Sequence, residues 1–225
     1  MKITVLIPVF NESNTISLIL EKIRENKILN LEIIVIDDNS TDGTYEILEK
    51  IKNIFEIKLI KNQTNKGKGY SIRQGLKLAT GKIIIIQDAD LEYDPKDYNK
   101  LINPILNNKA DVVYGTRFYS SGERKVHLFW HTLANKVLTL LCNIKTNLNL
   151  TDMECGYKAF KTEIVKKIEL KENRFGFEPE ITIKLARNKN FFYEVGVSYH
   201  GRTIQEGKKI RFKDALRALY IILFY

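Results

Sequence analysis

Four short, apolar-rich runs within the first 90 residues constrain the fold of this chain most strongly. They cover residues 3–8, 31–36, 56–60 and 83–86, and the last of them is Ile-Ile-Ile-Ile. Such runs are typical of strands buried on both faces of a sheet. The segments between them carry apolar residues at helical spacing, at Ile16, Ile19, Leu20 and Ile23, then Ile47, Leu48 and Ile51, then Ile72, Leu76 and Ala79. Alternating strands and helices predict an α/β fold with a Rossmann-like, doubly wound, mostly parallel sheet.

Sheets of this kind bind ligands at the carboxyl ends of their strands. The predicted ends carry Pro8, Phe10 and Glu12, then Asp37 and Asp38, then Asp88, Asp90 and Glu92. The turn after the first run has no glycine, and residues 65–69 lack the spacing of a P-loop. Dinucleotide-binding domains and P-loop proteins hold phosphates with glycine-rich backbone. The sequence therefore argues against NAD and favours a cation as the phosphate clamp.

The acidic stretch after the fourth run is the candidate cation site. In an extended segment, Asp88, Asp90 and Glu92 would face the same side, because alternate side chains do so. Converging carboxylates share a proton or bind a cation. Mg²⁺ in proteins commonly uses one or two carboxylates together with substrate phosphates. The hypothesis is a Mg²⁺ or Mn²⁺ ion that holds a nucleotide diphosphate, and the alternative is an acidic loop after a core strand.

Composition and charge narrow the classes of partner. The chain has 225 residues, 44% of them apolar, and a formal net charge of +9. Residues 1–100 carry equal numbers of basic and acidic residues, so the whole excess lies in 101–225. That asymmetry indicates an anionic partner (phosphate, acidic lipid or nucleic acid) or simply a solvated basic surface. The two cysteines, Cys142 and Cys155, are expected to be free thiols. With no run of 18 apolar residues, we expect no membrane-spanning helix.

Five ordered motifs resemble family 2 glycosyltransferases with the GT-A fold. They are PVFNE (8–12), DDNSTDGT (37–44), NKGKG (65–69), DAD (88–90) and GTR (115–117). Within that family the chain is similar to polyprenyl-phosphate glycosyltransferases of the dolichol-phosphate mannose synthase type. The narrower resemblance rests on DADLE, GTRF, TDMECGYKAF (151–160), FGFEPEIT (175–182) and YHGRTIQEGKK (199–209). It extends over residues 3–214 and implies one catalytic domain, 1–225, with a nucleotide-sugar half (1–110) and an acceptor and membrane half (111–225).

The resemblance also implies roles for single residues. Around the nucleotide base and ribose it places Pro8, Phe10, Glu12 and Asp38, with the backbone of Ile36. Asp88 and Ala89 would lie beside the sugar nucleotide. Asp90 would be a metal ligand, and Glu92 stands where such enzymes commonly have Gln as the second ligand. Arg117, Arg202 and Lys208 match basic positions that contact phosphates of donor or acceptor. The donor would be GDP-mannose or UDP-glucose.

Two segments of the second half have the pattern of amphipathic helices. The first, 127–144, carries Phe129, Trp130, Leu133, Val137, Leu140, Leu141 and Ile144, and the second covers 212–225. Basic residues flank both, which is typical of helices that lie on a membrane surface. The alternative for such a stripe is a helix of the core. From pattern alone the core helix is the more common arrangement. The family resemblance nevertheless favours the interfacial arrangement, with the protein peripheral on the cytoplasmic face of a membrane.

The expected reaction moves mannose or glucose from a nucleoside diphosphate sugar to a polyprenyl or dolichyl phosphate, with inversion. An acceptor phosphate is already ionised near neutral pH. A saccharide hydroxyl acceptor, the alternative, would need a general base, and Asp152 is the best candidate. A nucleotidyltransferase and a non-catalytic basic module are more remote alternatives. No nucleic-acid partner is expected, because the chain has no nucleic-acid-binding motif.

Residues 175–182 are expected to enter a further helix. Pro179 and Glu180 suit its first turn. Glu178 is interpreted as favouring the helix dipole, in preference to contacting the donor sugar or the acceptor.

Overall fold

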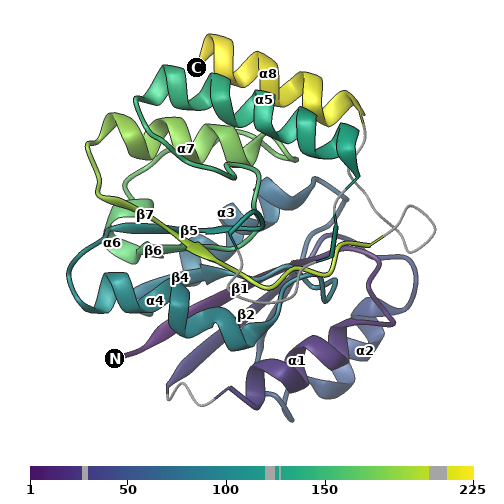
Figure 1. The fold of residues 1–225 in the computed structure, drawn as a ribbon. Helices are drawn as coiled ribbons and strands as arrows, with labels where there is room; N and C mark the ends of the chain where they lie inside the picture. The colour runs from purple at the N-terminus through teal and green to yellow at the C-terminus, as the bar shows by residue number, and fades with distance from the viewer. Residues whose placement is uncertain (27–29, 120–124, 127, 203–211) are drawn as a thin grey trace.

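The computed structural model describes residues 1–26, 30–119, 125–126, 128–202 and 212–225 (Figure 1). Within these residues one sheet of seven strands has the order β3-β2-β1-β4-β6-β5-β7. The strands are β1 (Ile3–Val9), β2 (Leu31–Asp37), β3 (Lys58–Lys61), β4 (Ile83–Ile86), β5 (Val112–Thr116), β6 (Lys158–Lys161) and β7 (Phe192–Gly196). All pairings are parallel except those of β6, which runs antiparallel to β4 and β5. The prediction of a mostly parallel α/β sheet is confirmed.

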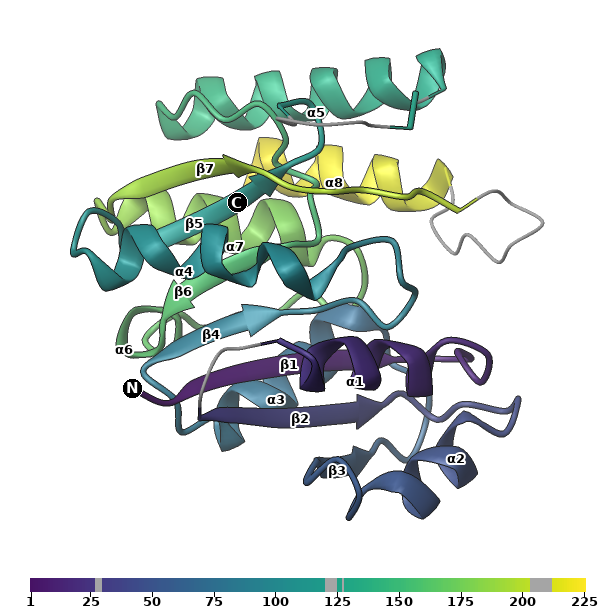
Figure 2. The ribbon, with the colours of Figure 1, turned by 60° about the horizontal axis from the view of Figure 1, so that its bottom comes forward.

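The helices cover both faces of this sheet (Figures 1 and 2). They are α1 (Ile16–Arg24), α2 (Thr44–Ile51), α3 (Lys68–Leu78), η1 (Pro95–Asp97), α4 (Tyr98–Leu106), α5 (Phe129–Thr146), α6 (Thr162–Val165), α7 (Phe177–Arg187) and α8 (Phe212–Phe224). Side chains of β1 alternate between the two cores: Val5 and Ile7 pack with α1, and Leu6 packs with α3. Burial on both faces is the reason that the strands read as continuous apolar runs.

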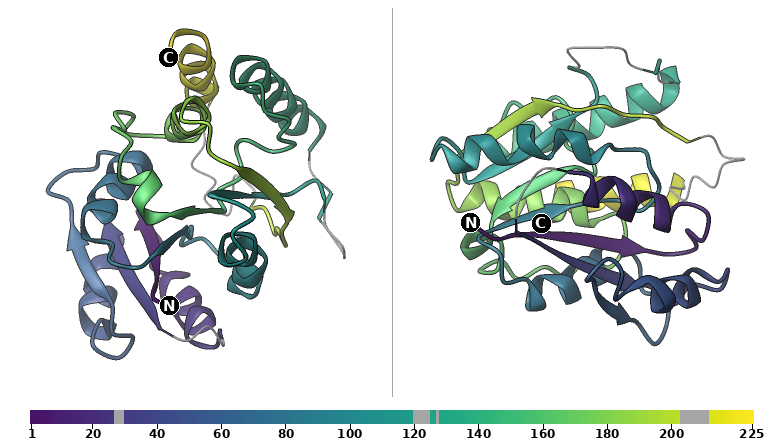
Figure 3. Two further views of the ribbon diagram at one scale, coloured as in Figure 1. Left: turned by 90° about the vertical axis from the view of Figure 1, so that its left-hand side faces the viewer. Right: turned by 90° about the horizontal axis from the view of Figure 1, so that it is seen from below.

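The outermost layer consists of α5 and α8, which lie side by side beyond α7 (Figures 1 and 3). The predicted span 127–144 is close to the observed α5, and α8 begins and ends almost where expected. Among the described residues, no helix is both long and apolar enough to cross a membrane.

The sequence did not reveal β6 and β7. Both are short, and β6 carries Lys at each end, of which Lys158 is completely buried. A buried lysine in a central strand hides the apolar pattern on which strand prediction depends. Strand β3 (Lys58–Lys61) also begins two residues after the start of the predicted run, 56–60.

Candidate active site

A pocket of about 480 Å³ lies at the carboxyl edge of the sheet. Its size is that of a small-molecule site. The lining includes nearly all residues predicted from the strand ends together with several from the second half: Pro8, Val9, Phe10, Glu12, Asp38, Asn65, Gly67, Lys68, Ser71, Asp88, Ala89, Asp90, Glu92, Tyr93, Arg117, Glu154, Gly156, Arg174, Phe175, Glu178, Tyr199 and Arg202. The structure thus brings the two halves of the sequence together around one cavity.

Asp38 forms a wall of the pocket and is 3% exposed. Its Oδ1 accepts hydrogen bonds from Asn62 Nδ2 at 2.8 Å and from the Lys66 N–H at 3.0 Å. Its Oδ2 accepts from the Gly67 N–H at 2.6 Å. Gly67 has φ +100°, and a Cβ there would lie 2.6 Å from the Asn173 carbonyl oxygen. Asp38 therefore shapes the loop that precedes α3, and Gly67 lets the segment around Asn173 approach it.

The other residues predicted to contact the nucleotide differ in whether they line the pocket. Pro8, Phe10 and Ala89 line the pocket, as the resemblance implies. Ile36 is fully buried in β2, with its Cδ1 against Gly75 of α3, and it is not part of the pocket lining. The predicted contact of Ile36 with the nucleotide therefore has no support in the described pocket. Lys208 lies outside the described residues.

The acidic stretch is a turn, not the extended segment assumed from the sequence. Leu91 adopts a left-handed conformation with φ +62°, which breaks the alternation of side chains. Asp88 pairs with Lys68, with 2.8 Å between Oδ1 and Nζ. Glu92 accepts from the Tyr199 hydroxyl at 2.9 Å and from the Arg202 N–H at 2.7 Å. Leu91 breaks the extended geometry on which the expected convergence rested, but all three carboxylates stay close enough to interact, because the charges of Asp88 and Glu92 both raise the pKa of Asp90.

Asp90 and Glu12 share one guanidinium. Arg202 Nη2 lies 2.8 Å from Glu12 Oε1 and 3.1 Å from Asp90 Oδ2, and Nη1 donates to Glu12 Oε2 at 3.0 Å. Burial, followed by the charges of Asp88 and Glu92, raises the pKa of Asp90 to about 7, although Arg202 acts in the opposite direction. Negative charge therefore exceeds positive charge at this point of the pocket, even with Arg202 in place.

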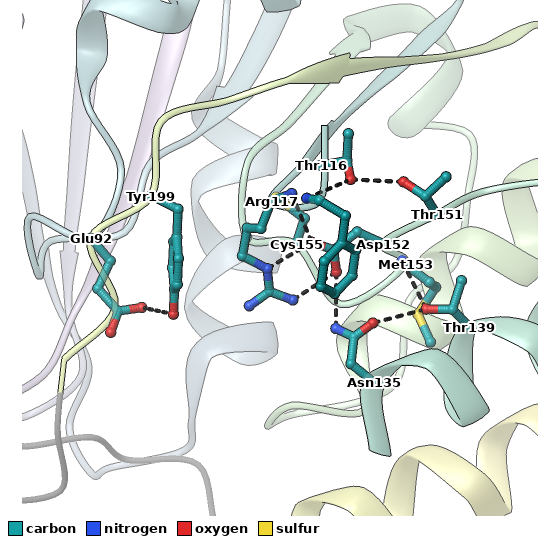
Figure 4. Close-up of polar contacts among 12 residues, drawn as sticks. Glu92, Thr116, Arg117, Asn135, Thr139, Thr151, Asp152, Met153, Cys155 and Tyr199 are labelled. Atoms are coloured by element: carbon teal, nitrogen blue, oxygen red, sulfur yellow. Dashed lines mark hydrogen bonds and ion pairs between the residues drawn. The ribbon is translucent and has the colours of Figure 1, made fainter. Parts of the chain in front are cut away.

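Arg117, at the end of β5, is held by Asp152 (Figure 4). Its Nε donates to Asp152 Oδ2 at 2.6 Å and its Nη2 to Oδ1 at 2.7 Å. Asn135 of α5 donates to the same Oδ1 at 2.9 Å. Although burial alone would raise the pKa of Asp152, the charge and hydrogen bonds of Arg117 lower it. Both oxygens of Asp152 are engaged and its basicity is reduced, which argues against its predicted role as a general base.

Lys68 and Glu154 of the pocket escaped the sequence analysis, and a third charged side chain, Glu178, was interpreted only as favouring a helix dipole. Lys68, at the start of α3, bridges Asp88 and Glu178, with 3.2 Å between Nζ and Glu178 Oε1. Glu154 also lines the pocket, and its Oε1 is buried without a hydrogen-bond partner among the described residues. The same holds for Glu178 Oε2. A buried polar atom left unpaired costs about 1–3 kcal/mol. Spatial pairings between residues 20 to 110 positions apart leave no signal in sequence spacing.

With this geometry in place, comparison with known proteins gives the family. Residues 4–169 match the model of the family described as Glycosyl transferase family 2. The chain belongs to glycosyl transferase family 2. A dolichol-phosphate mannosyltransferase from Pyrococcus furiosus is 29% identical over 229 residues, which cover 99% of this chain and 64% of that protein. A dolichyl-phosphate beta-glucosyltransferase from Trichomonas vaginalis is 28% identical, over 99% of this chain and 73% of that protein.

The fold of this family 2 glycosyltransferase also matches solved structures. Glucosyl-3-phosphoglycerate synthase from Mycobacterium tuberculosis, in complex with Mn²⁺, UDP and glucosyl-3-phosphoglycerate, superimposes with a TM-score of 0.74 at 20% identity. The match covers 99% of this chain and 78% of that one. The same enzyme has been crystallised with Mg²⁺ and UDP, with a TM-score of 0.73. The chain therefore has the GT-A-like α/β fold of these glycosyltransferase structures.

The acidic side of the family 2 pocket suits a divalent cation. Among the described residues, no three His, Cys, Asp or Glu side chains are close enough to hold a metal by themselves. The charge of Glu92 nevertheless acts on Asp90, and burial, together with the charges of Asp88 and Glu92, raises the pKa of Asp90 to about 7. Mg²⁺ commonly combines one or two carboxylates with substrate phosphates. These residues fit a cation that the diphosphate of a ligand completes.

Proposed function

We propose that this protein transfers a hexose from a nucleoside diphosphate sugar to the phosphate of a polyprenyl phosphate at a membrane surface. The observation that carries the proposal is the connection through α5. Asn135 on its inner side holds Asp152, and Asp152 holds Arg117 in the pocket. The outer side of the same helix is apolar and exposed. A lipid phosphate that reaches the pocket from that side would meet the guanidinium of Arg117.

Residue roles in the donor half follow from charge. The diphosphate leaving group gains negative charge in the transition state, and positive charge fixed beside it favours the reaction. Arg202 supplies a guanidinium in the pocket, held between Glu12 and Asp90. Asp90 and Glu92 would hold Mg²⁺ or Mn²⁺, which supplies Lewis acidity and a template for the diphosphate. Mannose and glucose donors, with GDP or UDP, both remain part of the proposal.

The acceptor is proposed to be a phosphate because the site lacks a suitable general base at Asp152. A saccharide hydroxyl must lose a proton as it attacks. Asp152 is completely buried, and Arg117 and Asn135 occupy its oxygens. A phosphate acceptor is ionised near neutral pH, so Arg117 needs only to bind and orient it. A single displacement at the anomeric carbon, with inversion, is the mechanism expected from the family resemblance.

The exposed face of α5 and α8 is the proposed membrane contact. Its apolar side chains are Val126, Leu128, Phe129, Trp130, Leu133, Val137, Leu140, Ile144, Leu216, Tyr220, Leu223 and Phe224, all exposed. On α5 only Thr139 and Cys142 are fully buried, with Leu138 and Leu141 packed against the core, and most of the apolar stripe is exposed, which supports the interfacial arrangement over the core-helix alternative. Exposed cations flank the face at Lys125, Lys136, Lys145, Lys213 and Arg217. Apolar area ringed by cations is complementary to a bilayer with anionic lipid. Attachment on the cytoplasmic side stays a prediction.

The test is a transfer assay with separate donor and acceptor arms. Purified protein is incubated with Mn²⁺ or Mg²⁺ and radiolabelled GDP-mannose or UDP-glucose. The acceptor is a short polyprenyl phosphate, the corresponding polyprenol, or an oligosaccharide. We expect label in the organic phase with the polyprenyl phosphate and none with the polyprenol. Label on the oligosaccharide alone, or transfer from no donor, would contradict the proposal.

A further inference from the structure

The pocket contains a second group of charged side chains, beside the one formed by Glu12, Asp90 and Arg202. Lys68 links Asp88 and Glu178 through its ammonium group, at 2.8 Å and 3.2 Å. Glu154 is electrostatically close to Glu178, whose charge helps to raise the pKa of the Glu154 carboxyl, after burial, to about 8. All four residues line the cavity.

Among these four side chains, two carboxyl oxygens have no hydrogen-bond partner within the described residues. Among the described residues, four buried side-chain polar atoms lack a hydrogen bond, and Glu154 Oε1 and Glu178 Oε2 are two of them. Glu178 is only 3% exposed. Buried polar groups in folded proteins are almost always hydrogen-bonded, so unpaired ones that line a cavity indicate where a ligand or water binds. A carboxyl group rotates easily about its last bond, and either oxygen can therefore face the cavity.

The backbone around Glu154 is held firmly on both sides. The buried ammonium of Lys158 donates to the carbonyl oxygen of Met153 at 3.0 Å and also to that of Cys155. The Gly156 N–H donates to the Tyr93 hydroxyl at 3.0 Å. A Cβ on Gly156 would lie 2.2 Å from Asp88 Oδ2, so this loop packs directly against Asp88. The unpaired carboxyl is thus carried by a rigid, pre-formed loop, which is how specific sites are built.

The charges of the group select the kind of ligand. Asp88 and Glu178 pair with Lys68 in the pocket, so Lys68 is already paired twice, and Glu154 lies close enough to Glu178 for the charge of Glu178 to raise its pKa. A phosphate would meet carboxylates here, whereas a neutral ring of hydroxyl groups would find acceptors. Its raised pKa keeps part of the Glu154 population protonated near neutral pH, so that this carboxyl can also donate. Adjacent hydroxyls of a sugar match such a pair of carboxyl groups.

We propose that Glu154 and Glu178 bind the hydroxyl groups of the donor hexose, and that Glu154 determines which hexose is accepted. The inference rests on the proposed function, since it assigns the sugar of the same donor. In this arrangement Asp90, Glu92 and Arg202 face the diphosphate. Lys68 holds Glu178 in place and fixes Asp88 beside it.

The experiment compares two ligands that differ only in the hexose. Calorimetry gives the dissociation constants of GDP and GDP-mannose, and of UDP and UDP-glucose, for the wild type, Glu154→Ala, Glu154→Gln and the control Glu169→Gln. Glu169 is an exposed carboxylate outside the pocket. Loss of a hydrogen bond to a charged group corresponds to about a tenfold or larger change in affinity. We expect Glu154→Ala to weaken binding of the sugar nucleotide by about that factor and to leave the nucleoside diphosphate unchanged, with a smaller loss for Glu154→Gln.

Selectivity gives the second readout. GDP-mannose and GDP-glucose, or UDP-glucose and UDP-galactose, share a base and differ at one hydroxyl. The ratio of their kcat/KM values should approach unity in Glu154→Ala. An unchanged ratio together with unchanged affinities would overturn the inference while leaving the proposed function intact. Equal weakening of nucleotide and sugar nucleotide would also overturn it, because it indicates a structural role. If Glu154→Ala does not fold, Glu154→Gln and Glu178→Gln give the same comparison. A wild type that transfers no hexose would instead refute the proposed function.

Discussion

Two carboxyl groups that line the same pocket, those of Asp38 and Glu154, differ in how fully the protein hydrogen-bonds them. Asp38 accepts hydrogen bonds from three donors of the protein, Asn62 Nδ2 and the N–H groups of Lys66 and Gly67. Glu154 has a buried oxygen with no partner among the described residues. Both line the pocket, where Asp38 is buried and Glu154 is half-buried. The difference teaches that lining a pocket is not evidence of binding a ligand. Asp38 builds the wall, and Glu154 has bonding capacity left for a substrate.

The other acids of the site can be sorted in the same way. Asp152 is committed to Arg117 and Asn135, which places it with Asp38. Asp90 accepts hydrogen bonds from the Glu92 N–H and from Arg202, but burial and the charges of Asp88 and Glu92 still raise its pKa, and this raised pKa is what places it with Glu154. Replacing members of the first class should change stability. Replacing members of the second class should change binding or turnover.

The largest effect is expected at Asp90. Asp90→Asn removes a proposed ligand of the divalent cation, and several kcal/mol of transition-state stabilisation correspond to about a thousandfold loss of turnover. The thermal midpoint should stay close to that of the wild type. Steady-state transfer rates with titrated Mn²⁺ measure this, and Asp94→Asn is the control, because Asp94 lies outside the pocket lining. Undiminished metal-dependent turnover would remove Asp90 from the ligand-binding class.

Asp152→Ala comes next and should act mainly on stability. It leaves the Arg117 guanidinium without its buried counterion, a loss that typically costs about 3–5 kcal/mol. Urea unfolding gives the free energy of unfolding. The control, Asp111→Ala, breaks a more exposed pair with Lys161 and should cost about 1 kcal/mol or less. A stable Asp152→Ala protein that binds donor and has lost only transfer would return Asp152 to a catalytic role.

A smaller loss is expected at Asp38. Asp38→Asn keeps the shape of the side chain but replaces one acceptor oxygen by a donor, which faces N–H groups of the 65–67 loop. Charge-assisted hydrogen bonds of this kind contribute about 1.5–3 kcal/mol. Stability should fall by about that amount, and nucleoside diphosphate and sugar nucleotide should be weakened together. If Asp38→Asn weakened only the nucleotides and left the unfolding curve unchanged, the contrast with Glu154 would be broken.

The smallest effect is expected at the exposed apolar face of α5. Trp130 is 75% exposed, so Trp130→Ala should change the free energy of unfolding by no more than about 0.5 kcal/mol. Burial of the indole in a bilayer would be lost, and partition into anionic vesicles should fall by about tenfold. Vesicle sedimentation measures it. The control is Ile54→Ala, at another exposed apolar position, near α2. Equal losses of vesicle partition in the two variants would argue against α5 as the membrane contact.

The sequence predicted those parts of the fold that depend on local pattern. Buried runs such as Ile83–Ile86 and the apolar spacing of α1 and α3 are visible along the chain, because both cores impose them. The motifs likewise predicted one site that contains Pro8, Phe10, Asp90 and Arg202. All four residues line the pocket. Strand β6 was missed because its buried Lys158 looks like a surface residue.

The site chemistry that was missed depends on pairing in space. A single left-handed residue, Leu91, turns the chain between Asp90 and Glu92, so the three acids do not follow the alternation that the sequence suggested. Glu178 was assigned to a helix dipole, yet it pairs with Lys68, 110 positions earlier. No spacing rule shows that Asp152 is paired with Arg117, or that one oxygen of Glu154 has no hydrogen-bond partner among the described residues. Those distinctions require the partners of each oxygen.

The central claim is that this pocket joins a hexose to a lipid phosphate. The most direct measurement is ³¹P NMR of a reaction that contains the protein, divalent metal, sugar nucleotide and a short polyprenyl phosphate in detergent. The account predicts that the phosphomonoester signal of the lipid is replaced by a phosphodiester signal, with one nucleoside diphosphate released for each diester formed. Release of nucleoside diphosphate while the lipid remains a monoester would contradict it.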